Sequence, residues 1–416
     1  MTVLPTPESI AERCNGDGEF SLAARGWSGG IRLTSGDEVS GVAVADGVAS
    51  AAVPEAGPGV IELDVPADAW SALTAAVPPP FLNDLTPAAF GPVRRTSDDL
   101  IWWQYGAAAQ RAIELLRPAT APSVTGNPVA HGTIEASVGR YVHLDLDGIT
   151  HRVYFEEAGS GIPLLLQHTA GSHGVQWRHL LETPAVTDHF RLIAYDLPYH
   201  GKSLPPVGQR WWESPYQLTG AFVRSVPLAL ADALGLDDPV FMGCSVGGLL
   251  ALDLALHAPE AFRAVISLEG SLYISGTTED LWGLWHPQVS NEAKARMMQG
   301  LTAPQSPIEY VKETTMAYSA GWPPTFLGDL HYYVEEFDLR DRASEIDTSQ
   351  VGVHILSGEY DWNAPPTAGR RAHEAIAGST YAEMPAMGHF PMSENPEAFL
   401  EHVLPVLDSI RATGAE

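Results

Sequence analysis

Ser245 stands at the centre of the pattern G-x-S-x-G, which residues 243–247 complete as Gly-Cys-Ser-Val-Gly. The apolar run 239–242 precedes the pattern and a largely apolar stretch over 248–256 follows it, so we expect a strand, a sharp turn and a helix. A serine on such a turn exposes its hydroxyl at a helix N-terminus, which stabilises nearby negative charge. These residues predict a nucleophile for acyl transfer rather than a glycine turn in which the serine only caps the helix.

The elements that must hold this serine are short apolar runs, which suit strands buried on both faces of a sheet. Such runs cover residues 163–167, 190–195, 239–242, 264–268, 351–356 and 380–384, with helical patterns between most of them. A hairpin over 141–146 and 151–157 precedes them and turns at Asp147-Gly148. The alternation predicts an open α/β sheet. The interval from Ser271 to Asp347 interrupts it, and we interpret this interval as an inserted helical cap.

Four motifs, in a fixed order between residues 140 and 410, resemble those of the α/β-hydrolase fold superfamily. Two of them are His168-Thr-Ala-Gly-Ser and Asp196-Leu-Pro-Tyr-His-Gly-Lys-Ser, which are similar to the family's HGxxG and D-x-P-x-H-G-x-S loops. The serine turn comes next, followed by the loops that end at Asp361 and contain His389. Each motif alone is weak, but all of them in order are specific. The resemblance implies a mostly parallel sheet with a helical cap and the catalytic order serine, acid, histidine.

The resemblance also implies a role for each residue in ester cleavage. His389 would take the proton of Ser245 and later protonate the leaving group, because a serine hydroxyl is a weak nucleophile without an adjacent base. Asp361 would hold the imidazole in the required tautomer and stabilise its charged form. Glu269, just after the predicted strand 264–268, is the alternative acid, since some members of this fold carry the acid there.

Negative charge that develops on the substrate oxygen needs two backbone N–H groups. One is expected from Val246, which follows the nucleophile, and the other from Ala170 in the His168 loop. Thr169 departs from the family pattern, in which glycine is usual at this position. Its hydroxyl would either donate to the developing oxyanion or bond its own backbone, and the sequence leaves both readings open.

Aromatic side chains are frequent in the cap interval and in the loop after Asp196, and they predict a pocket for an apolar or aromatic group. No arginine cluster lines these segments, so a phosphate or coenzyme A ester is not indicated. The residues expected to line the substrate pocket are Thr169, Trp212, Tyr273, Trp282, Trp285 and His286.

Composition limits the partners of the chain. Its 416 residues exceed one ordinary core, and a formal charge of −28 disfavours nucleic acid and anionic membranes as partners. Cys14 and Cys244 have neither disulfide nor zinc spacing, and no glycine loop suits a nucleotide, so we expect no metal and no cofactor. A secretory pattern and an apolar stretch of membrane-spanning length are both lacking, so a cytoplasmic protein is expected.

The first 117 residues follow a different pattern, which predicts a small α+β domain. Residues 19–27, 30–34, 38–45 and 60–65 alternate apolar and polar side chains, as strands of an antiparallel meander do. Helices are expected from Pro66 and from Ser97 to about Arg117. The small sheet with a turn at Asp46-Gly47, followed by a helix, loosely resembles a sterol-carrier-protein-like domain.

A packing, dimerisation or substrate-covering role suits this N-terminal domain better than lipid transport. Ile101-Trp-Trp places large apolar groups on its second helix, which we expect to pack on the hydrolase domain or on a second subunit of a homodimer or higher homo-oligomer. The expected boundaries are an N-terminal domain over 1–117, a linker over 118–130, a hydrolase core over 131–270 and 348–416, and the cap over 271–347.

Three functions fit these residues. The favoured one is a serine hydrolase that cleaves a carboxylic ester or lactone of a hydrophobic small molecule, aromatic ones included, through an acyl-enzyme on Ser245. A carbon–carbon bond hydrolase acting on a diketone-like substrate could use the same three residues. A non-catalytic ligand-binding protein is the third, and it is disfavoured because a receptor does not need a nucleophile, a base and an acid together.

Overall fold

The computed structural model describes residues 4–118, 123–124 and 129–413. They form two compact units, of which one contains Met1–Pro122 together with Gly283–Gln305 and the other contains Ser123–Trp282 together with Ser306–Glu416. The interval 271–347, expected as one cap, is thus divided between the two units. The linker expected over 118–130 lies largely outside the described residues. None of the helices in the described ranges is both long and apolar enough to cross a membrane.

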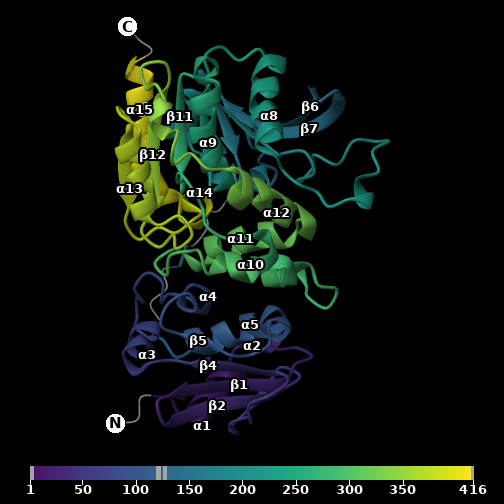
Figure 1. Cartoon of the computed structure of the whole chain (residues 1–416), viewed down its shortest axis with the longest axis vertical. Coiled ribbons are helices and arrows are strands. Elements are labelled where there is room, and N and C mark those ends of the chain that lie inside the picture. Colours follow the sequence, from purple (N-terminus) through teal and green to yellow (C-terminus); the bar gives the residue numbers. More distant parts are fainter. Residues whose placement is uncertain (1–3, 119–122, 125–128, 414–416) are drawn as a thin grey trace. The chain divides into compact units, whose positions relative to one another are not determined.

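The N-terminal unit is built on a five-stranded sheet with the order β3-β2-β1-β4-β5 (Figure 1, purple to blue). Its strands are β1 (Ser28–Ser35), β2 (Glu38–Ala45), β3 (Val48–Ser50), β4 (Val60–Asp64) and β5 (Arg94–Arg95). Its helices are α1 (Pro7–Asn15), α2 (Gly18–Ala23), α3 (Ala67–Leu73), α4 (Leu85–Ala88), α5 (Asp99–Glu114) and α10 (Asn291–Gln299). The predicted small α+β domain is therefore present, although its details differ from the expected meander.

Three features of this unit correct the sequence prediction. The run 19–27 was expected as a strand, but it begins with helix α2, because the Asp17 carboxylate caps the Phe20 N–H at 2.7 Å and Phe20 is fully buried. Strand β1 pairs antiparallel with β2 but parallel with β4, so the sheet is mixed. Helix α5 is capped by the side chain of Asp98, which accepts from the Leu100 N–H, and not by Ser97.

Helix α10 belongs to this unit although it follows α5 by about 180 residues in the chain. It packs on α5, and the Asn83 amide donates to the backbone carbonyls of Gly300 and Thr302 just beyond α10. Arg296 of α10 forms an ion pair with Asp84, and both side chains are largely buried. A segment from the cap interval thus completes the N-terminal unit and covers the helix that carries Trp102 and Trp103.

Removing residues 1–117 should cause aggregation or a change in oligomeric state. In the full chain Leu284, Met297, Met298 and Leu301 are at most 7% exposed, and they belong to the unit that would lose most of its residues. Newly exposed apolar surface of this kind drives association. Size-exclusion chromatography of residues 118–416 beside the full chain measures the effect. A shortened chain with the same oligomeric state and full activity would contradict the expectation.

The second unit is built on an eight-stranded sheet with the order β13-β12-β11-β10-β8-β9-β7-β6. The pairs β6–β7 and β7–β9 are antiparallel and the others are parallel. Its strands are β6 (Val138–Leu146), β7 (Ile149–Gly159), β8 (Ile162–Gln167), β9 (Phe190–Tyr195), β10 (Val240–Cys244), β11 (Ala264–Leu268), β12 (Gly352–Gly358) and β13 (Thr380–Met384). The predicted open, mostly parallel α/β sheet is confirmed.

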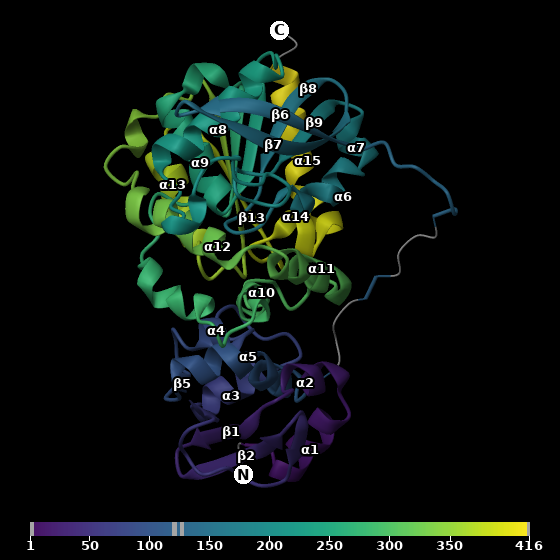
Figure 2. The same cartoon turned by 90° about the vertical axis from the view of Figure 1, so that its right-hand side faces the viewer.

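Helices cover both faces of this sheet, with α8, α9 and α13 on one side and α6, α7 and α15 on the other (Figure 2). The α-helices of the unit are α6 (Arg178–Leu181), α7 (Pro184–Thr187), α8 (Gly220–Ala233), α9 (Val246–His257), α11 (Ile308–Ser319), α12 (Pro323–Leu330), α13 (Pro366–Ala375), α14 (Pro391–Glu394) and α15 (Pro396–Thr413). Shorter helical turns are η1 (Gly174–Trp177), η2 (Trp211–Glu213), η3 (Pro259–Ala261), η5 (His331–Glu336) and η6 (Ala343–Glu345), while η4 (Thr278–Trp285) crosses the boundary between the units. The strand ends that face α11, α12 and η5 carry Ser245, Asp361 and His389.

Candidate active site

Ser245 occupies the one-residue turn between β10 and α9. Its φ of 59° and ψ of −114° are unusual for a residue with a side chain, and such strain costs about 1–3 kcal/mol. The turn is held by the Ser245 N–H, which donates to the Leu268 carbonyl at 3.0 Å. A Cβ at position 243 would lie 2.3 Å from the Gly247 carbonyl oxygen, so the close approach of strand and helix requires glycine there. The surrounding structure thus maintains the strained serine.

His389 and Asp361 form a buried pair. The His389 Nδ1 donates to Asp361 Oδ2 at 2.6 Å, and both residues are at most 3% exposed. The other carboxylate oxygen of Asp361 accepts from the N–H groups of Asn363 and Ala364, so the acid is fixed in place. With Nδ1 engaged, the free Nε2 of a neutral His389 is a proton acceptor. The Cys244 thiol donates to the His389 carbonyl at 3.1 Å, which ties the histidine loop to the residue before Ser245.

Glu269 lies near this pair but forms no hydrogen bond with His389. Both of its carboxyl oxygens accept from the Gly358 N–H, at 2.9 and 2.8 Å. Complete burial, and then the negative charge of Asp361, raise the pKa of Glu269 well above its usual value. Because His389 bonds Asp361 and not Glu269, the geometry favours Asp361 as the acid.

Asp361→Asn should lower kcat/KM by about 10³- to 10⁴-fold, whereas Glu269→Gln should cost far less. The asparagine would favour the wrong tautomer of His389, while the glutamine leaves the bond between His389 and Asp361 in place. Steady-state kinetics of both variants on one ester, with thermal unfolding as a folding control, compare them. A dead Glu269 variant beside a normal Asp361 variant would reverse the assignment.

Glu394 fixes the backbone on both sides of His389, and no sequence pattern singled it out. Its fully buried carboxylate accepts from the N–H groups of Gly388 at 2.8 Å and Phe390 at 3.2 Å. The hydroxyl of Ser306 donates to it at 2.8 Å. Because these bonds are to the backbone on either side of His389, Glu394 positions the imidazole and takes no part in proton transfer.

Val246 and Ala170, whose N–H groups were expected to stabilise the oxyanion, are 1% and 5% exposed. Val246 is the first residue of α9, so its N–H has no partner within the helix. The Thr169 hydroxyl follows neither of its two expected roles. It bonds the Oε1 of Gln176, at 3.0 Å, and the hydroxyl of Tyr318.

A second buried pair, His200 with Asp329, holds the loop that contains Ala170. Asp329 of α12 accepts from the Gly171 N–H at 2.7 Å and from His200 Nε2 at 2.8 Å. The other ring nitrogen of His200 faces the Pro198 carbonyl at 3.0 Å, so both nitrogens are placed to donate. Burial opposes a charge on His200, but the adjacent Asp329 carboxylate outweighs it and raises the pKa of His200. A charged His200 thus helps the cap helix fix the oxyanion loop.

Two other polar residues of these loops, Asp196 and His168, also support this geometry. Asp196 accepts from the N–H groups of Gly174 and Lys202, both at 2.7 Å, and thereby joins the two loops. His168 accepts from the Leu197 N–H through Nε2, while its Nδ1 bonds the Thr169 carbonyl. Burial lowers the pKa of His168 well below its usual value, and both of its ring nitrogens are engaged by backbone groups, so its role is structural.

Tyr333, from the cap interval, is hydrogen-bonded to the loop that carries Asp361. It lies on η5, is 2% exposed, and its hydroxyl accepts from the Asn363 side-chain amide at 2.5 Å. The sequence identified Tyr333 only as one of many aromatic residues in the cap, because nothing in the pattern distinguishes a core ring from one whose hydroxyl is used.

Most of the residues expected to line the substrate pocket lie at the surface. Trp212, Trp282 and Trp285 are 63%, 61% and 53% exposed, and Tyr273 is 37% exposed beneath the Arg340 guanidinium. Trp285 and His286 group with the N-terminal unit and not with the unit that contains Ser245. Thr169 alone among the six is buried beside the oxyanion loop, so the pocket role of the others stays a prediction.

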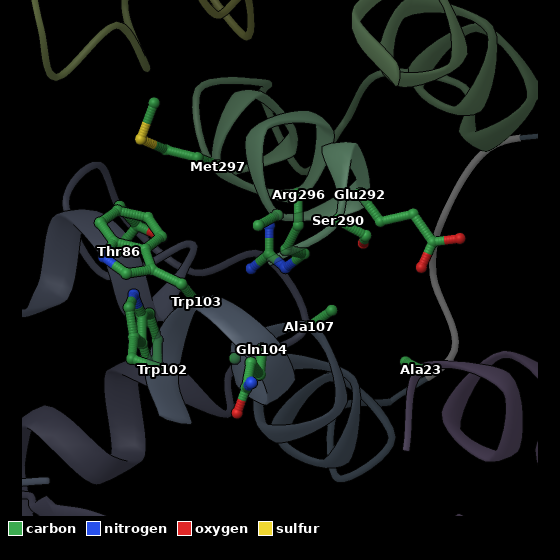
Figure 3. Close-up of a pocket in the computed structure, with 12 residues that line it drawn as sticks. Ala23, Thr86, Trp102, Trp103, Gln104, Ala107, Ser290, Glu292, Arg296 and Met297 are labelled. Carbon is green, nitrogen blue, oxygen red and sulfur yellow. The ribbon is translucent and has the colours of Figure 1, made fainter. Parts of the chain in front are cut away.

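Cavities occur in both units. One of about 450 Å³ borders Gly174, which follows the oxyanion loop, and its walls include Tyr154, Tyr199, Leu204 and Trp322. A second, of about 40 Å³, lies in the N-terminal unit, where Trp102 and Trp103 of α5 face Arg296 and Met297 of α10 (Figure 3). Its volume suits a few water molecules better than an organic ligand. Among the residues that the structure describes, no group of three or more His, Cys, Asp or Glu side chains could hold a metal ion.

Known proteins match a large part of the chain. A family model described as alpha/beta hydrolase fold matches residues 162–305. A pimeloyl acyl-carrier protein methyl ester esterase of Vibrio cholerae is 22% identical over 269 residues, covering 62% of this chain and 98% of that protein. A protein of Azorhizobium caulinodans assigned as a carbamate hydrolase is 30% identical over 261 residues, covering 61% and 93%. The solved structure of a hydrolase from Pseudomonas aeruginosa PA01 has a TM-score of 0.55 and 25% identity, covering 64% and 98%.

Proposed function

Because this chain belongs to the α/β-hydrolase family, we propose that it is a serine hydrolase that cleaves a carboxylic ester or lactone of a hydrophobic small molecule. The observation that carries the proposal is the strained Ser245 turn, tied through Cys244 to the buried His389–Asp361 pair. A strained, positioned serine next to an oriented imidazole is what nucleophilic acyl transfer requires.

In the proposed reaction Ser245 Oγ attacks the carbonyl carbon while its proton passes to His389 Nε2. The N–H groups of Val246 and Ala170 stabilise the negative carbonyl oxygen. The bond to the leaving alcohol then breaks as His389 returns the proton to it, which leaves an acyl-enzyme. A water molecule attacks the acyl-enzyme, giving one proton to His389, and the acid leaves as Ser245 recovers its proton.

A hydrophobic substrate is supported by the cavity beside the oxyanion loop. Its volume lies in the range of ligand pockets, and Tyr154, Tyr199, Leu204 and Trp322 supply apolar surface. Its walls also carry Lys202, Glu156 and Asp196, and the Lys202 ammonium group is bonded to the Tyr154 hydroxyl at 2.8 Å. These features favour an uncharged ester over a phosphorylated one.

A panel of p-nitrophenyl esters, alkyl esters, aryl esters, lactones and 1,3-diketones, each assayed with the wild type and Ser245→Ala, tests the proposal. Turnover of esters or lactones that depends on Ser245 supports it. Turnover confined to the diketones would replace it with carbon–carbon bond cleavage by the same residues. If no carbonyl compound is cleaved but one of them binds, the result supports a non-catalytic ligand-binding protein.

For the N-terminal unit we propose a packing role instead of lipid transport. Its largest aromatic side chains are used internally, since Trp27 is 1% exposed and stacks on Tyr105 with ring centroids 5.0 Å apart. The small cavity between α5 and α10 offers no room for a sterol. Sedimentation of the full chain would show whether a homodimer forms, as the exposed Leu22 and Phe90 of this unit suggest.

A further inference from the structure

One backbone N–H group in the loop that follows β8, that of Ala170, differs from its neighbours on both sides. Thr169 donates its N–H to the Gln176 side chain at 3.1 Å. Gly171 donates its N–H to the Asp329 carboxylate at 2.7 Å. Ala170 is 5% exposed, and its N–H makes no hydrogen bond to any residue that the structure describes. Buried N–H groups are rarely left unpaired, so this one is suited to an oxygen of the substrate.

Two cap helices hold this loop, one on each side of Ala170. On α11, the hydroxyl of the buried Tyr318 bonds that of Thr169. On α12, the backbone itself touches the loop, because a Cβ at Gly171 would lie 2.5 Å from the Cβ of Phe326 and 2.8 Å from its Cα. The direction of the Ala170 N–H therefore depends on the position of both cap helices.

Asp329 holds the loop with a negative charge, at a place where the reaction must stabilise a negative charge. Its side chain is fully buried, and two negative charges repel each other far more there than in water. His200 supplies the opposite charge, because its Nε2 lies 2.8 Å from the same Asp329 oxygen that accepts from Gly171. Its Nδ1 lies 3.0 Å from the Pro198 carbonyl. Both neighbours are acceptors, so both ring nitrogens need a hydrogen, and only the imidazolium has two.

We infer that Asp329 is a positioning residue for the oxyanion N–H of Ala170, and that His200 cancels the charge of Asp329 at the oxyanion. This inference rests on the proposed function. A carboxylate is a strong acceptor for the N–H of Gly171, and the imidazolium lets the cap use it without opposing the transition state. The pair acts on the charged intermediate and not on the neutral substrate, so its loss lowers kcat and leaves KM nearly unchanged.

The test compares kcat for His200→Gln, Asp329→Asn and the double variant. His200→Gln leaves the carboxylate unbalanced and should lose about 100-fold. Asp329→Asn keeps an oxygen for the N–H of Gly171 and should lose about 10-fold. The double variant is neutral and keeps an acceptor beside a donor, so it should be at least about 5-fold more active than His200→Gln. Loss of packing alone gives no such recovery, because a second substitution in the same pair then only adds damage.

A trifluoromethyl ketone gives a second readout, because its adduct with a serine carries a negative oxygen. Its Ki should rise most in His200→Gln and less in the double variant, while KM changes less than about 3-fold. Asp253→Asn is the matched control, since this buried carboxylate on α9 also pairs with a histidine and an arginine, His257 at 2.9 Å and Arg224 at 2.8 Å. None of these groups belongs to the oxyanion loop, so the control should keep the wild-type kcat and Ki, and thermal unfolding checks that each variant folds.

Two results would overturn the inference: a double variant no more active than His200→Gln, or a Ki that is the same in His200→Gln and in the wild type. If His200→Gln does not fold, the double variant decides alone. A kcat within about 30-fold of the wild type then supports the inference, and a greater loss overturns it. Failure of the proposed function is a separate result, because Ser245→Ala would then turn over the same esters at the wild-type rate.

Discussion

Ser245→Ala is expected to lose at least about 10³-fold in kcat while the protein stays folded. The substitution removes the nucleophile and leaves only substrate binding and the two oxyanion N–H groups, which alone give residual catalysis. Alanine keeps a Cβ at the strained φ of 59°, so we expect the backbone of the turn to stay the same. The loss is measured in steady state on the ester that the wild type hydrolyses fastest.

Ser245→Gly is the matched control for the strain at this position. Glycine adopts a positive φ without the cost that a side chain imposes, so this variant should be as inactive as Ser245→Ala but unfold at a higher temperature. Inactivity shared by both variants assigns the loss to the missing hydroxyl. Turnover near that of the wild type in either variant would reject the acyl-enzyme mechanism.

His389→Ala should be comparably damaging, and adding Ser245→Ala to it should cost little more. A nucleophile and its base act as one unit, so once one of them is removed, removing the other causes little further loss of kcat. The measurement is a double-mutant cycle of kcat for the two single variants, the double variant and the wild type.

The cycle also identifies the base. If the losses in the double variant multiply, His389 is not the base for Ser245. His200 provides a contrast in the same assay: it is buried and paired with Asp329, and both of its ring nitrogens are engaged. Its replacement by glutamine should therefore lower activity through the oxyanion loop while Ser245 remains essential.

The sequence was most informative about the larger sheet and the serine turn. Buried parallel strands such as 190–195 and 264–268 are nearly all apolar, and the structure has strands with those bounds. The pairing of His389 with Asp361 follows from loops at neighbouring strand ends, since β12 and β13 are adjacent in the sheet. Motifs on loops that the fold brings together can be found before the fold is known.

The rest depended on tertiary contacts that no local pattern encodes. Asp329 accepts a hydrogen bond from Gly171, and Glu394 accepts one from Ser306, and both partners lie far away in the sequence. Tyr333 differs from its neighbour Tyr332 only in what its hydroxyl meets. In the N-terminal unit, the alternation of residues 19–27 predicts a strand, although α2 begins there. A helix of six residues has too few turns for its 3.6-residue period to be visible in the sequence.

The division of the cap interval between the two units has a consequence for the order in which the chain folds. Domains generally fold as they emerge during synthesis, N-terminal parts first, at roughly 5–20 residues per second. The first 118 residues emerge early, but the segment 283–305 that completes their unit is made only after β6 to β11. For a time on the order of ten seconds the helix that carries Trp102 and Trp103 lacks its packing partner α10. During this time the ribosome synthesises residues of the other unit. The nascent chain is then at its most vulnerable to misassociation, and a chaperone that binds exposed aromatic surface would act in this interval.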